Sequence, residues 1–112
     1  MQTVTTFGGG IRRNPRYTFQ CPATLTPSEG AESSQAVTIV EISSHGFQAR
    51  APAGLHEGQR WTVKAEIATG IHTEVQAQVV RRVVSESGQL FGFKVDRPDP
   101  AWERCVAWLQ AA

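Results

Sequence analysis

Apolar and polar side chains alternate along most of this chain with a period of two residues. The apolar side chains take the odd positions between Tyr17 and Leu25, and the same alternation recurs between Trp61 and Ile67. A period of two puts successive side chains on opposite faces of a β-strand. Further strand-like stretches, rich in apolar and β-branched residues, occur at residues 36–42, 47–50, 71–84 and 91–95. The pattern therefore predicts an all-β domain of six short strands joined by polar turns.

The second predicted strand is apolar at both odd and even positions, so its orientation is harder to assign. Unbroken alternation would put Ile42 on one face and Ile39 and Glu41 on the other. Ser43 would then share an outer face with Glu41, which brings a carboxylate and a hydroxyl together. Gly46 follows in a tight turn, where a glycine permits a sharp bend and the approach of a flat ligand.

The period changes after Asp99, where the chain is typical of a helix start. Asp99 can cap the helix with its side chain, and Pro100 lacks only an N–H that the first helical position does not use. The next apolar residues recur at spacings of three and four, which predicts an amphipathic helix over about residues 100–110. Six strands and one C-terminal helix that covers the sheet predict a small antiparallel β-barrel.

Length and charge narrow the class of protein. The chain has 112 residues and a net charge of +1, which indicates one domain and argues against a general nucleic-acid binder. No apolar run is long enough for membrane insertion, and no signal peptide is evident, so we expect a soluble cytoplasmic protein. Cys21 and Cys105 lack the spacing of metal ligands, and we expect both to be small buried hydrophobes.

Three arginines, Arg12, Arg13 and Arg16, lie within five residues. A guanidinium group presents a rigid fork of donors that matches phosphate oxygens and the edge of guanine. The glycine run at residues 8–10 has no preferred backbone geometry, so residues 1–10 are expected to form a flexible arm. Taken alone, the three arginines fit either a clamp for an anionic ligand or an ordinary basic N-terminus.

The spacings Arg12-x-x-x-Arg16 and Glu41-x-Ser43-x-x-Gly46 together resemble the two signature motifs of the PilZ domain family. That family's second motif is Asp/Asn-x-Ser-x-x-Gly, so Glu41 is a departure from it. The resemblance extends over about residues 11–97. It implies a six-stranded PilZ-type barrel over about residues 16–97, within one PilZ-like domain of residues 11–112. It also implies binding of the bacterial second messenger cyclic di-GMP, with no other cofactor.

The resemblance also implies a role for each motif residue. Arg12 and Arg16 would grip phosphate or guanine, and Glu41 would accept hydrogen bonds from the guanine N1–H and amino group. The Ser43 hydroxyl would bond a phosphate or a base edge, and the Gly46 backbone would border the base. Arg13 would add charge beside the ligand. Binding would order the N-terminal arm and pass a signal to an effector protein that the sequence does not identify.

A second hypothesis is that the chain is a PilZ-like protein–protein adaptor that has lost nucleotide binding, since Glu41 replaces the expected Asp or Asn. A nucleic-acid-binding barrel is disfavoured by the near-neutral charge, and an enzyme by the lack of an assembled catalytic group. Arg81 and Arg82 fit a second anion contact less well than plain surface positions. Three histidines are expected on the surface: His45, His56 and His72. Trp102 and Trp108 fit either the core or an apolar surface patch, and the core is the favoured position for both.

Overall fold

The structure, a computed structural model, describes residues 4–5, 15–28, 33–52, 54–85 and 88–111. These residues form strands β1 (Val4–Thr5), β2 (Arg16–Pro27), β3 (Gln35–Ser43), β4 (Gly46–Ala51), β5 (Arg60–Ala68), β6 (Ile71–Ser85) and β7 (Gly88–Val95), and helix α1 (Pro100–Ala111).

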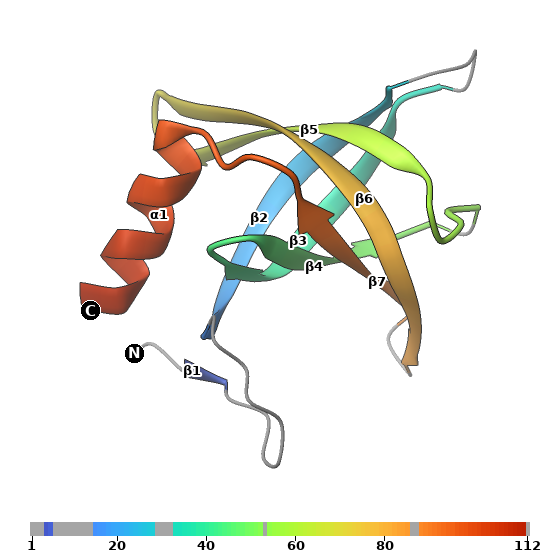
Figure 1. The fold of residues 1–112 in the computed structure, drawn as a ribbon, viewed down its shortest axis with the longest axis horizontal. Helices are drawn as coiled ribbons and strands as arrows, with labels where there is room; N and C mark the ends of the chain where they lie inside the picture. Colours follow the sequence, from blue (N-terminus) through green and yellow to red (C-terminus); the bar gives the residue numbers. More distant parts are fainter. Residues whose placement is uncertain (1–3, 6–14, 29–32, 53, 86–87, 112) are drawn as a thin grey trace.

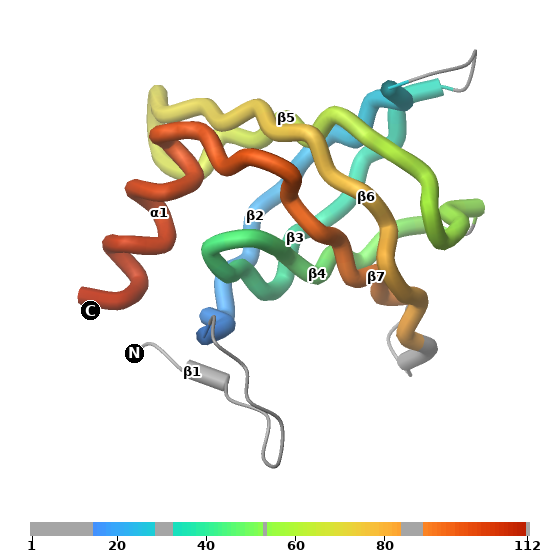
Figure 2. Tube along the Cα trace, viewed as in Figure 1, coloured from blue at the N-terminus to red at the C-terminus, as the bar shows by residue number. Residues whose placement is uncertain are grey.

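Strands β2 to β7 form a closed antiparallel barrel. They follow one another in the order β2-β3-β4-β7-β6-β5, and β5 pairs back onto β2. Figure 1 shows the strongly bent sheet with α1 at one end of it, and Figure 2 follows the same path of the chain. The predicted six-stranded barrel with a single C-terminal helix is confirmed.

Strand β2 closes the barrel and also carries β1. Its residues from Ala23 to Pro27 pair with β5, whereas its first two residues, Arg16 and Tyr17, pair with Thr5 and Val4 of β1. This short strand belongs to the segment that we expected to be a flexible arm, of which the structure describes only these two residues. Strand β1 places Thr5 directly opposite Arg16, the second arginine of the first motif.

The apolar side chains of the alternating strands fill the barrel interior, as the period of two predicts. Phe47 of β4 and Phe93 of β7 stack inside, with ring centroids 4.5 Å apart. Neither cysteine is bonded to another, and both are buried, as predicted. The fully buried large side chains are Trp61, Trp102, Phe91, Leu25, Ile39, Ile42, Val63, Val79 and Val95.

The alternation expected along β3 is wrong, because a β-bulge interrupts it. Ile39 and Ile42 are both fully buried, although they are three positions apart and unbroken alternation would put them on opposite faces. The pairing of β3 with β4 shifts its register between Ile39 and Glu41, and such a shift reverses the facing of the residues beyond it. Glu41 and Ser43 still alternate with Ile42 and so lie on the opposite side of β3 from it.

Helix α1 begins where Asp99 and Pro100 predicted. The Asp99 carboxylate accepts a hydrogen bond from the Trp102 amide at 2.8 Å, which is the geometry of an N-terminal cap. Trp102 is buried, as expected, but Trp108 is 53% exposed, so the expectation of a core position for Trp108 is wrong. The helix spacing permits this, since Trp102, Cys105 and Val106 already supply the buried stripe.

Candidate functional site

One row of residues crosses five neighbouring strands on the outside of the barrel. The strand registers pair Thr18 with Glu41, Glu41 with Gln48, Gln48 with Gly92, and Gly92 with Arg81. Positions from β2, β3, β4, β7 and β6 therefore lie side by side, although they span more than sixty residues of sequence. The pairing brings together polar side chains whose relation the sequence does not reveal.

A second row lies next to this one, one side-chain repeat along the strands. Ser43 pairs with Gly46, and Gly46 pairs with Lys94. Arg16 occupies the corresponding position on β2, because the residue after it, Tyr17, pairs with the residue before Ser43. The described part of both motifs is thus concentrated in two adjacent rows of the barrel wall.

Arg16 and Glu41 form an ion pair across the two rows. Arg16 Nη1 lies 3.3 Å from Glu41 Oε1, and the two side chains are 15% and 21% exposed. Partial burial makes such a pair stronger than one in open water. Gln48 adds to it: with its amide oxygen turned toward the guanidinium, Gln48 accepts a hydrogen bond from Arg16 Nη1 at 2.9 Å.

Arg81 reaches the same amide oxygen from the other side. Its Nη2 lies 3.0 Å from the Gln48 oxygen, and its side chain passes over Gly92, where a Cβ would stand 3.0 Å from Arg81 Cγ. A side chain at position 92 would occupy the path that Arg81 takes. We refer to Arg16, Glu41, Gln48 and Arg81 as the Arg16–Arg81 cluster.

The turn of the second motif is held together internally. The Ser43 hydroxyl donates to the Gly46 carbonyl at 3.3 Å, and Ser43 is only 9% exposed. A Cβ at Gly46 would stand 2.7 Å from the carbonyl oxygen of Phe93, while the Gly46 φ angle lies outside the left-handed region. The glycine is therefore required by the close approach of β7, rather than by the sharp backbone turn that we expected.

Helix α1 is attached to this turn. The buried indole Nε1 of Trp102 donates to the Ser43 carbonyl at 3.0 Å, and the Trp102 ring packs on Phe47 at a centroid distance of 5.5 Å. A change in the position of the turn would move a hydrogen-bond acceptor of the helix. The turn and α1 are thus linked through the side chain of Trp102.

The two rows carry an excess of positive charge. Arg16, Arg81 and the exposed Lys94 contribute three cations, and Glu41 contributes the single carboxylate. Three like charges with one counter-charge favour an anion at this face. The chemistry of these two rows is that of a cationic surface rich in hydrogen-bond donors.

The structure brings together four of the six residues that the sequence indicated. Arg16 and Glu41 are in contact, and Ser43 and Gly46 lie in the neighbouring row. Arg12 and Arg13 lie outside the described residues.

The sequence patterns did not indicate Gln48 or Lys94, and they favoured a plain surface position for Arg81. In the structure Arg81 lies within β6, opposite Gly92, and its guanidinium contacts Gln48. The one available signal was a glycine in the middle of an otherwise bulky strand, which often marks a close approach.

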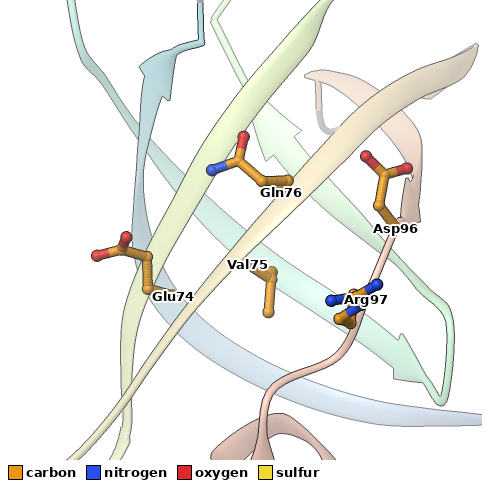
Figure 3. Close-up of a pocket in the computed structure, with 5 residues that line it drawn as sticks. All are labelled: Glu74, Val75, Gln76, Asp96 and Arg97. Carbon is orange, nitrogen blue, oxygen red and sulfur yellow. The ribbon is translucent and has the colours of Figure 1, made fainter.

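A separate open groove of about 440 Å³ lies beside β6 and the segment that follows β7 (Figure 3). Both of its carboxylates are already paired: Asp96 with Arg60, and Glu74 with Lys64 at 3.7 Å. None of the described motif residues lines it, so this groove and the Arg16–Arg81 cluster are different places. The lining residues are Glu74, Val75, Gln76, Asp96 and Arg97.

The described residues contain no group of three His, Cys, Asp or Glu side chains placed to hold a metal ion. His45, His56 and His72 are exposed, as predicted. No helix in the described part of the chain has the length and apolar character needed to cross a bilayer.

The fold and its outer face define a small closed antiparallel β-barrel protein with one helix packed at its end. A sequence profile of the PilZ domain family matches residues 11–110. The chain belongs to the PilZ domain family.

Two solved structures share the fold. The PilZ domain of YcgR from Escherichia coli, solved with c-di-GMP, aligns with a TM-score of 0.64 at 19% identity, covering 88% of this chain and 87% of the other. The Bacillus subtilis inhibitor of motility, MotI/DgrA, aligns with a TM-score of 0.72 at 12% identity. That alignment covers 91% of this chain but only 51% of the B. subtilis chain. No curated protein sequence gives a significant match.

Proposed function

We propose that this chain is a receptor for cyclic di-GMP that binds the nucleotide on the cationic outer face of the barrel. The observation that carries the proposal is the convergence of Arg16, Glu41 and Ser43 in two adjacent rows of β2 and β3. Membership of the PilZ family and the c-di-GMP in the related YcgR structure support the choice of ligand.

The ligand carries two phosphates and two guanines, which match the groups at this face. Arg16, together with Arg12 of the same motif, would fork onto phosphate oxygens or onto guanine O6 and N7. Arg13 would add charge. The Glu41 carboxylate would accept hydrogen bonds from the guanine N1–H and amino group, which a guanidinium cannot do.

The second motif would contact the nucleotide through Ser43 and Gly46. The Ser43 hydroxyl can exchange its bond to the Gly46 carbonyl for a bond to a phosphate or base edge, because a hydroxyl rotates freely. The Gly46 backbone would border the base. The role is binding and not catalysis.

The signal would pass to an effector protein through a change in the N-terminal arm. Thr5 of β1 pairs with Arg16, so a ligand that repositions the Arg16 side chain acts next to the strand that the arm contributes. Trp102 offers a second route, since it joins α1 to the Ser43 carbonyl. Both routes begin at motif residues.

One observation favours a second candidate function, a PilZ-type adaptor without nucleotide. Glu41 is one methylene longer than the family's Asp and reaches the Arg16 guanidinium at 3.3 Å. A carboxylate in that position competes with phosphate for the same donors. In an adaptor, this ion pair would be a permanent part of the wall.

Isothermal titration calorimetry with cyclic di-GMP separates the two functions. We expect micromolar or tighter binding by the unmodified chain, and loss of at least about tenfold in affinity in both Arg12→Ala and Arg16→Ala, since each loses a charge-assisted bond. Arg104→Ala removes an exposed arginine from α1 and is the matched control, expected to bind normally.

Cyclic di-AMP provides the ligand control, because it keeps the phosphates and changes the base edge. Weak or absent binding of cyclic di-AMP is expected. An absence of heat with cyclic di-GMP at high protein concentration would rule out the receptor and leave the adaptor.

A further inference from the structure

Arg81 is directed into the site by two local features of the barrel. The pairing of β6 with β7 shifts register between Val79 and Arg81, and a bulge of this kind re-aims the side chain that follows it. Arg81 pairs with Gly92 of β7. Because glycine has no side chain, the barrel surface is open at that position. A Cβ at position 92 would lie 3.0 Å from Arg81 Cγ and 3.1 Å from Arg81 Nε. The Arg81 side chain therefore lies directly over Gly92.

Beyond Gly92, the guanidinium groups of Arg81 and Arg16 reach the same acceptor. Arg81 Nη2 and Arg16 Nη1 both donate to the Gln48 amide oxygen, at 3.0 and 2.9 Å. Two like charges around one neutral acceptor repel each other, and Glu41 is in contact with only one of them. An anion with several oxygens could accept from both groups and remove the repulsion.

We propose that Arg81 is a further ligand-binding residue that, together with Arg16, binds an anionic phosphate oxygen of the nucleotide. Gln48 occupies the acceptor position before the ligand arrives and holds both guanidinium groups in place. Gly92 is a positioning residue, because its missing side chain permits the path of Arg81. This inference rests on the proposed function and extends the site from β2 and β3 across to β6.

The neighbouring Arg82 provides a matched control. It carries the same charge on the same strand, but it is exposed and pairs with the buried Phe91 rather than with Gly92. Removal of Arg82 therefore changes the net charge as much as removal of Arg81 does and leaves the Arg16–Arg81 cluster intact.

Titration calorimetry of the full chain with cyclic di-GMP tests the inference. We expect Arg81→Ala to weaken binding about ten- to a hundredfold and Arg82→Ala to change it less than about threefold. Arg81→Lys keeps the charge but loses the planar fork, so its affinity is expected to lie between those of Arg81→Ala and the unmodified chain.

Gly92→Ala is a second variant that leaves every charge in place. Its methyl group displaces the Arg81 side chain, so we expect weaker binding with little loss of thermal stability, since the Arg81 side chain is not part of the apolar core. Circular dichroism melting of each variant identifies any that fails to fold.

The outcomes distinguish the two proposals. If Arg81→Ala and Gly92→Ala bind as tightly as the unmodified chain while Arg16→Ala does not, the assignment of Arg81 is overturned and the receptor function stands. An equal loss in Arg81→Ala and Arg82→Ala would also overturn it, because only total charge would then matter. If the unmodified chain binds nothing, both proposals are overturned.

Discussion

In the proposed receptor, the side-chain length of Glu41 bears directly on ligand binding. Its carboxylate lies 3.3 Å from Arg16 Nη1 in a partly buried position, so a nucleotide bound at this face would compete with an internal anion for the same guanidinium. The family's shorter Asp would hold its carboxylate one methylene further from Arg16. The free energy needed to break the Arg16–Glu41 ion pair would therefore lower the affinity for the nucleotide.

We therefore expect Glu41→Asp to bind cyclic di-GMP more tightly, by up to about tenfold. A hydrogen bond to a charged group is worth roughly 1.5–3 kcal/mol, and the shorter side chain would return only part of this free energy to ligand binding. Glu41→Gln also releases Arg16, but its amide accepts fewer hydrogen bonds from guanine. It should therefore bind less tightly than Glu41→Asp. Calorimetric dissociation constants for the three proteins provide the test, and an unchanged or weaker affinity for Glu41→Asp would show that Glu41 is no handicap.

Helix α1 is fastened to the barrel at its first turn by Asp99. One carboxylate oxygen accepts from the Thr73 hydroxyl at 2.6 Å and from the Trp102 amide at 2.8 Å, and the other accepts from the Glu74 amide at 2.9 Å. Burial acts to raise the pKa of Asp99, but these hydrogen bonds outweigh it, and the pKa lies below its usual range. The ionised form therefore stabilises the docked helix.

The sign of the pH dependence follows from this lowered pKa. The stabilisation is fully present above the unfolded pKa of about 3.9 and is lost as the pH falls through the lower folded value. Asp99→Asn should lower the free energy of unfolding by about 1 kcal/mol at pH 7 and by little near pH 2. Urea unfolding followed by tryptophan fluorescence measures both values.

Asp96→Asn is the control for this measurement, since Asp96 is an exposed acid whose ion pair with Arg60 is worth little. An equal destabilisation by Asp99→Asn at both pH values would contradict the assignment of charge as the cause.

At the scale of the molecule, the described residues share one apolar core that joins the barrel to the helix. Cys21 of β2 and Cys105 of α1 belong to the same buried cluster as the barrel phenylalanines. Burial, and to a smaller degree the neighbouring Cys21, raises the pKa of Cys105 to about 11. Burial, with a contribution from Glu66, also raises the pKa of Cys21. Both thiols are therefore protonated and inaccessible in the native protein.

We expect both thiols to react with an aromatic disulfide reagent only as the molecule unfolds as a unit, with the same dependence on urea. The single variants Cys21→Ala and Cys105→Ala report on one thiol each, and absorbance of the released thiolate measures the rate. If Cys105 reacts at lower urea than Cys21, α1 leaves the barrel before the barrel opens, and the core is not a single cooperative unit.

Local patterns carried most of the fold information. The alternation from Tyr17 to Leu25 identified β2, and the cap at Asp99 identified the start of α1, because strand faces and helix ends depend on residues near one another in sequence. The bulges could not be predicted in this way. A bulge results from the fit between two paired strands, so the facing of Ile39 and the position of Arg81 depended on partners elsewhere in the chain.

The sequence by itself determined the class of fold, the family and the two motifs, since these follow from periodicity and short-range spacing. The tertiary structure decided which side chains meet: that Glu41 neutralises Arg16, that Arg81 crosses Gly92 to the same amide oxygen, and that Trp102 holds the turn after Ser43. The physical reason is strand register. Pairing between distant segments sets these contacts, and no local pattern in the chain encodes that alignment.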